Sequence, residues 1–406
     1  MPAGHQALIR LGGKPAVGLF VFTLLAFVAE TQLSQYVQAD LGFRQPFLIF
    51  YIVHSSFALL FPLHLLYLCV FSQYSLDSLW ISVLDAVRRH LAPRAASSAA
   101  AKPTFPTGRF YRLLAYLTTG LTLPGLMWFI AVTLAPVTDV TAIWNTNAFF
   151  AYVLTVLITR SKWDPRRLVA VLIATGGVLA VVYGGTTIEA GTSDTGAEQS
   201  VKADPRSHRA APLVGDLLTL AASIIYAAYQ VLYKIHAALP DDPEVQADLY
   251  TPIPEADSTG EDEEVPLDEP LLVADDIIHP LPFGLYPNFL TSAIGVCTML
   301  VLWIPVPIIH ALGIEPFEMP QTGATYGVIA GIALTGAIFN AGFMVLLGVW
   351  GPIVTSVGSL LTIVLVFVSD AIFGGAVEAV TIWSVLGCGS IVAAFAILAY
   401  DLAKRR

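Results

Sequence analysis

The chain has 406 residues, of which 12% are charged and 56% are apolar, and its formal net charge is −10. Soluble domains usually carry about 25% charged residues, so this composition excludes an ordinary soluble enzyme, and the apolar content excludes a disordered protein. Long apolar stretches recur along the whole sequence, which indicates a polytopic membrane protein. We therefore expect an all-α fold in a lipid bilayer.

Ten stretches are long and apolar enough to cross a bilayer, which needs about 20 residues in helical form. An even number of spans places both termini on the same side. The expected spans are Ala16–Val37, Pro46–Phe71, Arg112–Leu134, Thr138–Thr159, Leu168–Gly185, Leu213–Ile235, Tyr286–Leu312, Gly323–Val349, Ile353–Phe373 and Ile382–Tyr400.

The distribution of charge predicts the orientation. If both termini are cytosolic, 16 of the 20 Lys and Arg residues lie in cytosolic segments, as the positive-inside rule requires. The segment Pro240–Pro282 contains 14 acidic residues and no Lys or Arg, so the rest of the chain, with 16 acids and 20 bases, is mildly basic. The net negative charge of the chain therefore comes from one cytosolic insert, whose composition is typical of a disordered linker.

Weak internal similarity predicts a duplicated architecture. Pro136-Val137-Thr138 opens the fourth expected span and Pro352-Ile353-Val354-Thr355 opens the ninth, while Gly176-Gly177 in the fifth corresponds to Gly387-Cys388-Gly389 in the tenth. A repeat with an odd number of spans inserts its second copy upside down, and such inverted repeats are typical of transporters.

This duplication predicts the domain organisation of the chain. Residues 1–185 form a first five-helix repeat with a basic cytosolic loop at 72–108, and residues 186–212 form a polar extracytosolic loop. Residues 213–406 form the second repeat, which the acidic cytosolic loop 240–282 interrupts.

The ten-span pattern, the stretch Pro136–Gly185 and the stretch from Gly215-Asp216 through Tyr226 and Lys234 resemble the drug/metabolite transporter superfamily. They are most similar to its EamA-type proteins and to the F branch of solute carrier family 35, which includes fungal vacuolar-membrane relatives. The resemblance implies a 5+5 inverted-repeat helical bundle that moves organic solutes. The acidic insert departs from the compact pattern of that family.

Polar groups in hydrocarbon are expensive and therefore mark candidate functional residues. Glu30 lies about two-thirds along the first span, where a carboxylate must be protonated, paired or hydrated. It is either a proton carrier or substrate-cation contact within the bundle, or a solvated group near the outer headgroups.

A polar stripe follows one face of the sixth span through Thr219, Ser223, Tyr226, Gln230 and Lys234. Such a stripe faces a water-filled cavity or another helix. Tyr226 and Gln230 offer hydrogen bonds and stacking to an organic solute. Lys234 either extends to the cytosolic interface or contacts an anion.

Other spans add further candidates. Asn145 and Asn147 in the fourth span and Asn340 in the eighth are amides without an obvious packing role, and Ser359 in the ninth is a candidate that helix packing also explains. Gly327 and Gly331 form a Gly-x-x-x-Gly pair that predicts close helix packing, either within the chain or in a homodimer. No catalytic residue, metal site or cofactor is expected.

Two short patterns in the acidic loop resemble signals that sort membrane proteins between compartments. Tyr250–Ile253 resembles a tyrosine-based sorting signal and Asp268–Leu272 an acidic dileucine signal, so we expect sorting adaptors as partners. They favour a vacuolar or other endomembrane location over the plasma membrane. No nucleic acid partner is expected.

The sequence thus favours a secondary transporter of a small organic solute by alternating access, coupled to protons or to exchange. It lacks a phosphate-binding Gly-x-x-x-x-Gly-Lys-Ser/Thr motif, so no ATP-driven module is expected. The alternatives are a non-transporting receptor or scaffold that uses the acidic loop, and an intramembrane enzyme. The lack of intramembrane basic clusters favours a neutral or zwitterionic solute over a nucleotide sugar.

Overall fold

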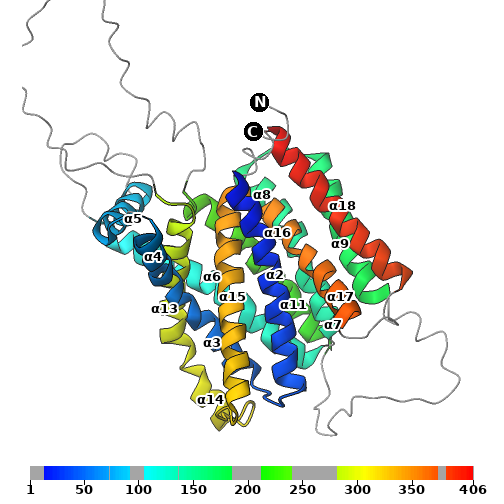
Figure 1. Cartoon of the computed structure of the whole chain (residues 1–406). Coiled ribbons are helices and arrows are strands. Elements are labelled where there is room, and N and C mark those ends of the chain that lie inside the picture. The colour runs from blue at the N-terminus through cyan, green and yellow to red at the C-terminus, as the bar shows by residue number, and fades with distance from the viewer. Residues whose placement is uncertain are drawn as a thin grey trace, which may run out of the picture.

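The computed structural model describes residues 13–72, 74–91, 105–135, 137–184, 212–239, 281–373 and 381–405, and these residues form helices and no strands (Figure 1). The first half contains α2 (Gly13–Ala39), α3 (Pro46–Ser56), the 3-10 turn η1 (Phe57–Leu59), α4 (Leu60–Phe71), α5 (Leu76–Leu91), α6 (Thr107–Leu134), α7 (Val137–Asn145), α8 (Asn147–Thr159) and α9 (Pro165–Gly184). The second half contains α11 (Pro212–His236), α13 (Leu285–Leu302), α14 (Pro305–Ala311), α15 (Gly323–Trp350), α16 (Pro352–Ser359), α17 (Leu361–Phe373) and α18 (Ile382–Arg405).

In the described part of the chain, nine helical segments are long and apolar enough to cross a membrane. They coincide with nine of the ten expected spans, so the chain is an all-helical, multi-pass integral membrane protein. The third expected span, Arg112–Leu134, lies in α6, which has 28 residues but is not among the nine.

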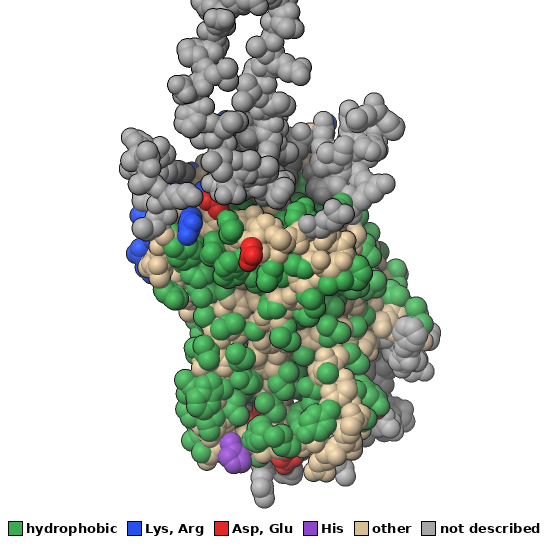
Figure 2. All heavy atoms as spheres, turned by 60° about the vertical axis from the view of Figure 1, so that its left-hand side comes forward, with side chains coloured by type: hydrophobic (Ala, Val, Ile, Leu, Met, Phe, Trp, Pro, Cys, Tyr) green, Lys and Arg blue, Asp and Glu red, His purple; other side chains and the backbone are tan. Residues whose placement is uncertain are grey.

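Basic side chains gather near the upper edge of the bundle (Figure 2), which is the end at which α2 begins and α18 ends (Figure 1). Contacts between elements tie this end together, since Arg109 of α6 donates to the Leu91 carbonyl of α5 and Arg167 of α9 pairs with Asp401 of α18. Below it, hydrophobic side chains cover most of the face shown in Figure 2, with basic ones only near its upper edge. We call the end of the bundle at which α2 begins and α18 ends the basic end.

Helices from the two halves of the sequence pack against one another in pairs. The closest pairs are α9 with α18, α2 with α15, and α6 with α11, while α13 packs on α3, η1 and α4, and α16 packs on α8. Each half therefore buries its apolar side chains mainly against the other half.

The α9–α18 pair depends on two facing glycines. A Cβ atom on Gly177 would lie 2.7 Å from the Gly387 carbonyl oxygen, and one on Gly387 would lie 2.5 Å from the Gly177 oxygen. The backbones thus touch at a point where a side chain on either residue would collide. Small residues allow such close approach between membrane helices, where van der Waals packing drives association.

Two spans that we expected to be continuous are interrupted. The fourth breaks at Thr146, between α7 and α8, and the ninth breaks at Leu360, between α16 and α17. At both breaks the backbone forms tighter bonds three residues apart, from Thr146 N–H to the Ile143 carbonyl and from Leu360 N–H to the Val357 carbonyl. The mean hydropathy of each whole span stays high despite the break, so a window of span length does not reveal either one.

The loop expected at 72–108 contains the helix α5. Leu79, Val83 and Val87 are buried along one of its faces, while Trp80 and Ile81 are exposed and basic residues occupy its last turn. Spacings of four residues between the buried positions are typical of an amphipathic helix, so this element was readable from the sequence.

The expected Gly327–Gly331 packing pair is only partly correct. A Cβ atom on Gly331 would lie 3.1 Å from the Leu33 side chain, but nothing lies within 4 Å of one on Gly327, which is exposed. The tightest contacts of α15 with α2 lie farther along the helix, where a Cβ atom on Gly336 would meet Glu30 and one on Gly342 would collide with Thr23. Use of Gly327 in a homodimer stays a prediction.

Candidate functional site

Five aromatic rings form a continuous row across the bundle, from α7 through α11 and α15 to α2. The ring centroids of Trp144 and Tyr226 are 5.2 Å apart with nearly parallel planes, and Tyr226 stacks in turn on Phe343 at 6.3 Å. Phe343 contacts Phe339 at 6.0 Å, and Phe339 contacts Phe27 at 4.8 Å. We call these five residues the aromatic row; it joins elements from both halves of the chain.

Glu30 lies at the α2 end of this row, one helical turn after Phe27. Its Oε1 atom would be 2.7 Å from a Cβ on Gly336, which is near the middle of the 28-residue helix α15. The half-buried carboxyl group therefore lies deep along α15 rather than at its outer end. Within the described residues, no cation pairs with Glu30 and no donor hydrogen-bonds it.

Asn340 lies beside the same glycine. Its Nδ2 atom donates to the Gly336 carbonyl oxygen at 2.9 Å, one turn back in its own helix. This bond holds the amide close to Glu30 through a shared neighbour, Gly336. Glu30 and Asn340 thus both lie beside Gly336, at the middle of the α2–α15 contact.

Asn145 and Asn147 flank the break at Thr146, at the other end of the row. Asn145 donates to the Thr141 carbonyl at 2.7 Å and Asn147 to the Trp144 carbonyl at 2.9 Å. The break itself is fastened to α11, because Ser223 Oγ lies 3.1 Å from Thr146 Oγ1 and donates to the Trp144 carbonyl. These bonds position the Trp144 ring over Tyr226.

The polar stripe of the sixth span lies in α11, and its buried members face other helices, which is one of the two environments that the sequence allowed. Thr219, Ser223 and Gln230 are fully buried. Gln230 Oε1 accepts a hydrogen bond from Ser356 of α16, while Gln230 Nε2 is buried without a described partner. Gln230 therefore joins α11 to α16 rather than lying on the aromatic row.

Lys234 and Ser359 have partners that sequence reasoning missed. Lys234 Nζ donates to the Gly348 carbonyl in the last turn of α15, where a cation also complements the helix dipole. Ser359 donates to the Ser356 carbonyl of its own helix at 2.7 Å, the local bond that Ser commonly makes in membrane helices. Both acceptors are backbone atoms, which no side-chain pattern reveals.

The candidates thus separate into two groups. Glu30, Asn340, Tyr226 and Asn145 lie along the aromatic row, whereas Gln230, Lys234 and Ser359 make contacts among α11, α15 and α16. Sequence reasoning missed Phe27, Phe339 and Phe343 because aromatic residues do not stand out within apolar stretches. Phe27 and Phe343 lie one helical turn from Glu30 and Asn340 respectively, and Phe339 is adjacent to Asn340, which is the signal that would have found them.

The sequence matches no family model. It is 24% identical over 409 aligned residues to a protein of Schizosaccharomyces pombe named uncharacterized transporter C405.03c, and the alignment covers 96% of this chain and 97% of that protein. A solved crystal structure with 13% sequence identity shares the fold with a TM-score of 0.58, over 96% of this chain and 99% of the other.

Proposed function

We propose that this protein is a secondary transporter that moves a small organic solute across a membrane by alternating access. The name of the fission yeast relative, which aligns over nearly its full length, supports transport. The resemblance to the drug/metabolite transporter superfamily supports the same proposal and suggests membership of its EamA-type branch. The alternative functions are a receptor or scaffold and an intramembrane enzyme, and measurements of ligand binding and uptake distinguish them from a transporter.

The observation that carries the proposal is Glu30, a carboxyl group without a described partner beside the middle of α15. A charged group in apolar surroundings is costly unless it is paired, hydrated or neutralised by a proton. A carboxyl group at this position, despite that cost, fits a residue that binds a proton and the cationic group of the solute alternately. A purely structural bundle would gain stability from an apolar residue here.

The packing of the helices supports a 5+5 inverted repeat with α6 as the tenth span. Exchange of the two halves maps α2 onto α11, α6 onto α15 and α9 onto α18, so the α2–α15 contact becomes the α11–α6 contact. The α9–α18 pair maps onto itself. The two broken spans, at Thr146 and Leu360, also correspond under this exchange, and interrupted helices at matching positions are typical of transporter binding sites.

The chemistry of the site favours a zwitterionic or amine-bearing solute. Aromatic faces attract cations, and Glu30 supplies a negative charge at the end of the row. Lys234 contacts the Gly348 carbonyl rather than the row, so it does not offer the row a positive charge for a phosphate or carboxylate. We therefore place the amino group of the solute at Glu30 and its apolar part along Phe339 and Phe343.

A ligand screen tests this assignment. Purified protein is heated with a panel of amino acids, biogenic amines, sugars and nucleotide sugars, and ligands that raise the unfolding temperature are measured by titration. Tyr226→Phe keeps the ring stack and should bind like wild type, whereas Tyr226→Leu should weaken binding roughly two- to tenfold because an aromatic contact is lost. Hits restricted to nucleotide sugars, or equal affinities for both variants, would contradict the proposal.

We also propose that the basic end is cytosolic, with both termini on that side, and that the protein resides in a vacuolar or other endomembrane. The excess of basic side chains at that end supports the orientation. The two sorting patterns at Tyr250–Ile253 and Asp268–Leu272 lie outside the described residues and stay predictions.

A further inference from the structure

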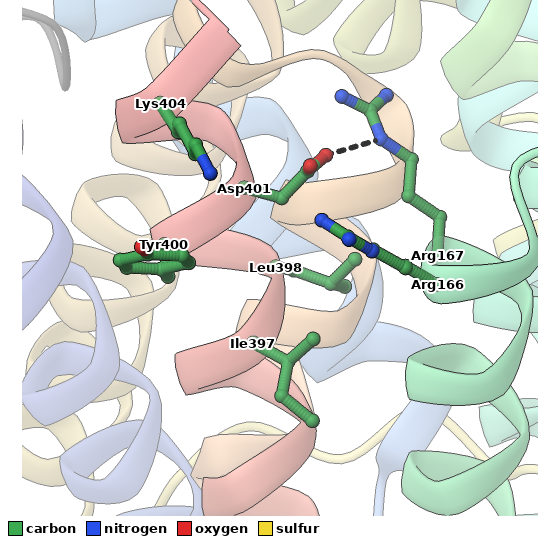
Figure 3. Close-up of a pocket in the computed structure, with 7 residues that line it drawn as sticks. All are labelled: Arg166, Arg167, Ile397, Leu398, Tyr400, Asp401 and Lys404. Atoms are coloured by element: carbon green, nitrogen blue, oxygen red, sulfur yellow. Dashed lines mark hydrogen bonds and ion pairs between the residues drawn. The ribbon is translucent and has the colours of Figure 1, made fainter.

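A small recess opens at the basic end between the first turn of α9 and the last turns of α18 (Figure 3). Arg166 and Lys404 line it from opposite helices, Ile397 and Leu398 form its apolar wall, and Tyr400 lies at its side. This recess shares no helix with the aromatic row, and no step of the proposed transport uses it.

The charges around the recess are unbalanced. Arg167 pairs with Asp401 at 2.8 Å and with Asp164 at 3.7 Å, so the two acidic residues of this corner already share one cation. Arg166 and Lys404 form no ion pair with any residue that the structure describes, and both side chains are exposed. The recess therefore presents two cations that no carboxylate of the described residues neutralises.

The surroundings place the recess at the level of lipid headgroups. Tyr400 is 69% exposed and Trp163, just before α9, is 55% exposed, as expected of aromatic residues at a membrane–water interface. Farther along the same two helices, Val169 and Ile397 are exposed apolar side chains on membrane-spanning segments. A ligand in the recess would contact the cations of Arg166 and Lys404 and, farther along the two helices, the exposed apolar side chains.

We propose that this recess binds the phosphate of an anionic phospholipid in the cytosolic leaflet, between Arg166 and Lys404. Basic recesses between membrane helices on the cytosolic side fit acidic headgroups, and the exposed apolar surface below fits the acyl chains. A soluble phosphate would satisfy the cations but not that surface. Because α9 and α18 come from different halves of the chain, the bound lipid would join the two halves at their cytosolic ends.

The test measures unfolding temperature in nanodiscs made of phosphatidylcholine alone, or of phosphatidylcholine with phosphatidylinositol or phosphatidylserine. Anionic lipid should raise the unfolding temperature of the wild type by roughly 2 °C or more, because a ligand that binds only the folded state stabilises it. Arg166→Gln combined with Lys404→Gln should lose this increment. Equal unfolding temperatures of wild type and double variant in pure phosphatidylcholine show that the variant folds.

A matched control removes two cations elsewhere on the same end. Arg89→Gln combined with Arg112→Gln, on α5 and α6, removes the same charge and should keep the increment. An increment that survives in the Arg166/Lys404 variant, or that both variants lose equally, would overturn the site. The wild type in detergent is also heated with inorganic phosphate and with phosphatidylinositol. If both raise its unfolding temperature equally, the recess binds a soluble anion rather than a lipid, and the proposal is overturned.

Discussion

Lys234 shows at the scale of one residue how a membrane lysine can serve structure. Its Nζ atom donates to the Gly348 carbonyl in the last turn of α15, where helix carbonyls lack intrahelical partners. The lysine therefore links the end of α11 to the end of α15. Neither of the two interpretations that the sequence allowed, an interfacial lysine or an anion contact, included this acceptor.

Substitution of Lys234 distinguishes a helix-end contact from a substrate contact. Lys234→Met should lower the free energy of unfolding by about 1–3 kcal/mol, because the buried Gly348 carbonyl loses a charge-assisted bond. Lys234→Arg keeps a donor at this position and should cost less. Affinity for the ligand found in the screen, measured by titration, should stay within about twofold of wild type in both variants. A large loss of affinity without loss of stability would instead assign Lys234 to the substrate.

At the scale of elements, the α9–α18 contact offers a sharp test because each tight glycine has an open neighbour. A Cβ on Gly177 or Gly387 would collide with the facing backbone, whereas nothing lies within 4 Å of one on Gly176 or Gly389. Gly177→Ala and Gly387→Ala should each destabilise the protein by about 1–3 kcal/mol through overpacking. Thermal unfolding in detergent measures the effect.

The neighbouring variants are the controls for that experiment. Gly176→Ala and Gly389→Ala introduce the same methyl group into open space and should be neutral, or stabilise by roughly 0.5–1 kcal/mol, because alanine favours a helix over glycine. If all four variants unfold at the same temperature, the backbones of α9 and α18 do not touch in the membrane-embedded protein.

The elements also show how far the sequence could predict the fold. Hydropathy predicted ten membrane-spanning segments, and nine of them coincide with the candidate spans of the described residues, because twenty apolar residues in a row have few alternatives to crossing the bilayer. It missed the amphipathic helix α5, and it missed the breaks at Thr146 and Leu360 because mean hydropathy over a whole span averages across them. Backbone interruptions depend on tertiary contacts such as Ser223 with Thr146.

The candidate site was predictable only in part. Glu30, Asn145 and Asn340 stood out as polar residues in apolar stretches, and the structure places them along or beside the aromatic row. The row itself joins α2, α7, α11 and α15, so it depends on which helices are neighbours. A single sequence does not show which helices are neighbours. The roles of the aromatic row in solute binding and in proton coupling stay predictions.

At the scale of the whole molecule, the distribution of basic residues predicts the orientation of the bundle. If the basic end is cytosolic, a cysteine at Lys162 faces the cytosol and one at Glu318 faces the other side. Both positions are exposed, between α8 and α9 and between α14 and α15. In a background with Cys69, Cys297 and Cys388 replaced by serine, a membrane-impermeant thiol reagent added to sealed endomembrane vesicles, cytosolic side out, should label only Lys162→Cys. Labelling of Glu318→Cys alone would reverse the orientation.

The central claim is that Glu30 couples transport of an organic solute to protons. The most direct measurement is uptake of the labelled ligand from the screen into proteoliposomes with and without an imposed pH gradient, for wild type, Glu30→Gln and Glu318→Gln. Wild type and Glu318→Gln, which neutralises an exposed carboxylate, should accumulate the ligand in response to the gradient, whereas Glu30→Gln should not. Full gradient-driven uptake by Glu30→Gln would remove Glu30 from the mechanism, and failure of every ligand to enter wild-type vesicles would contradict transport.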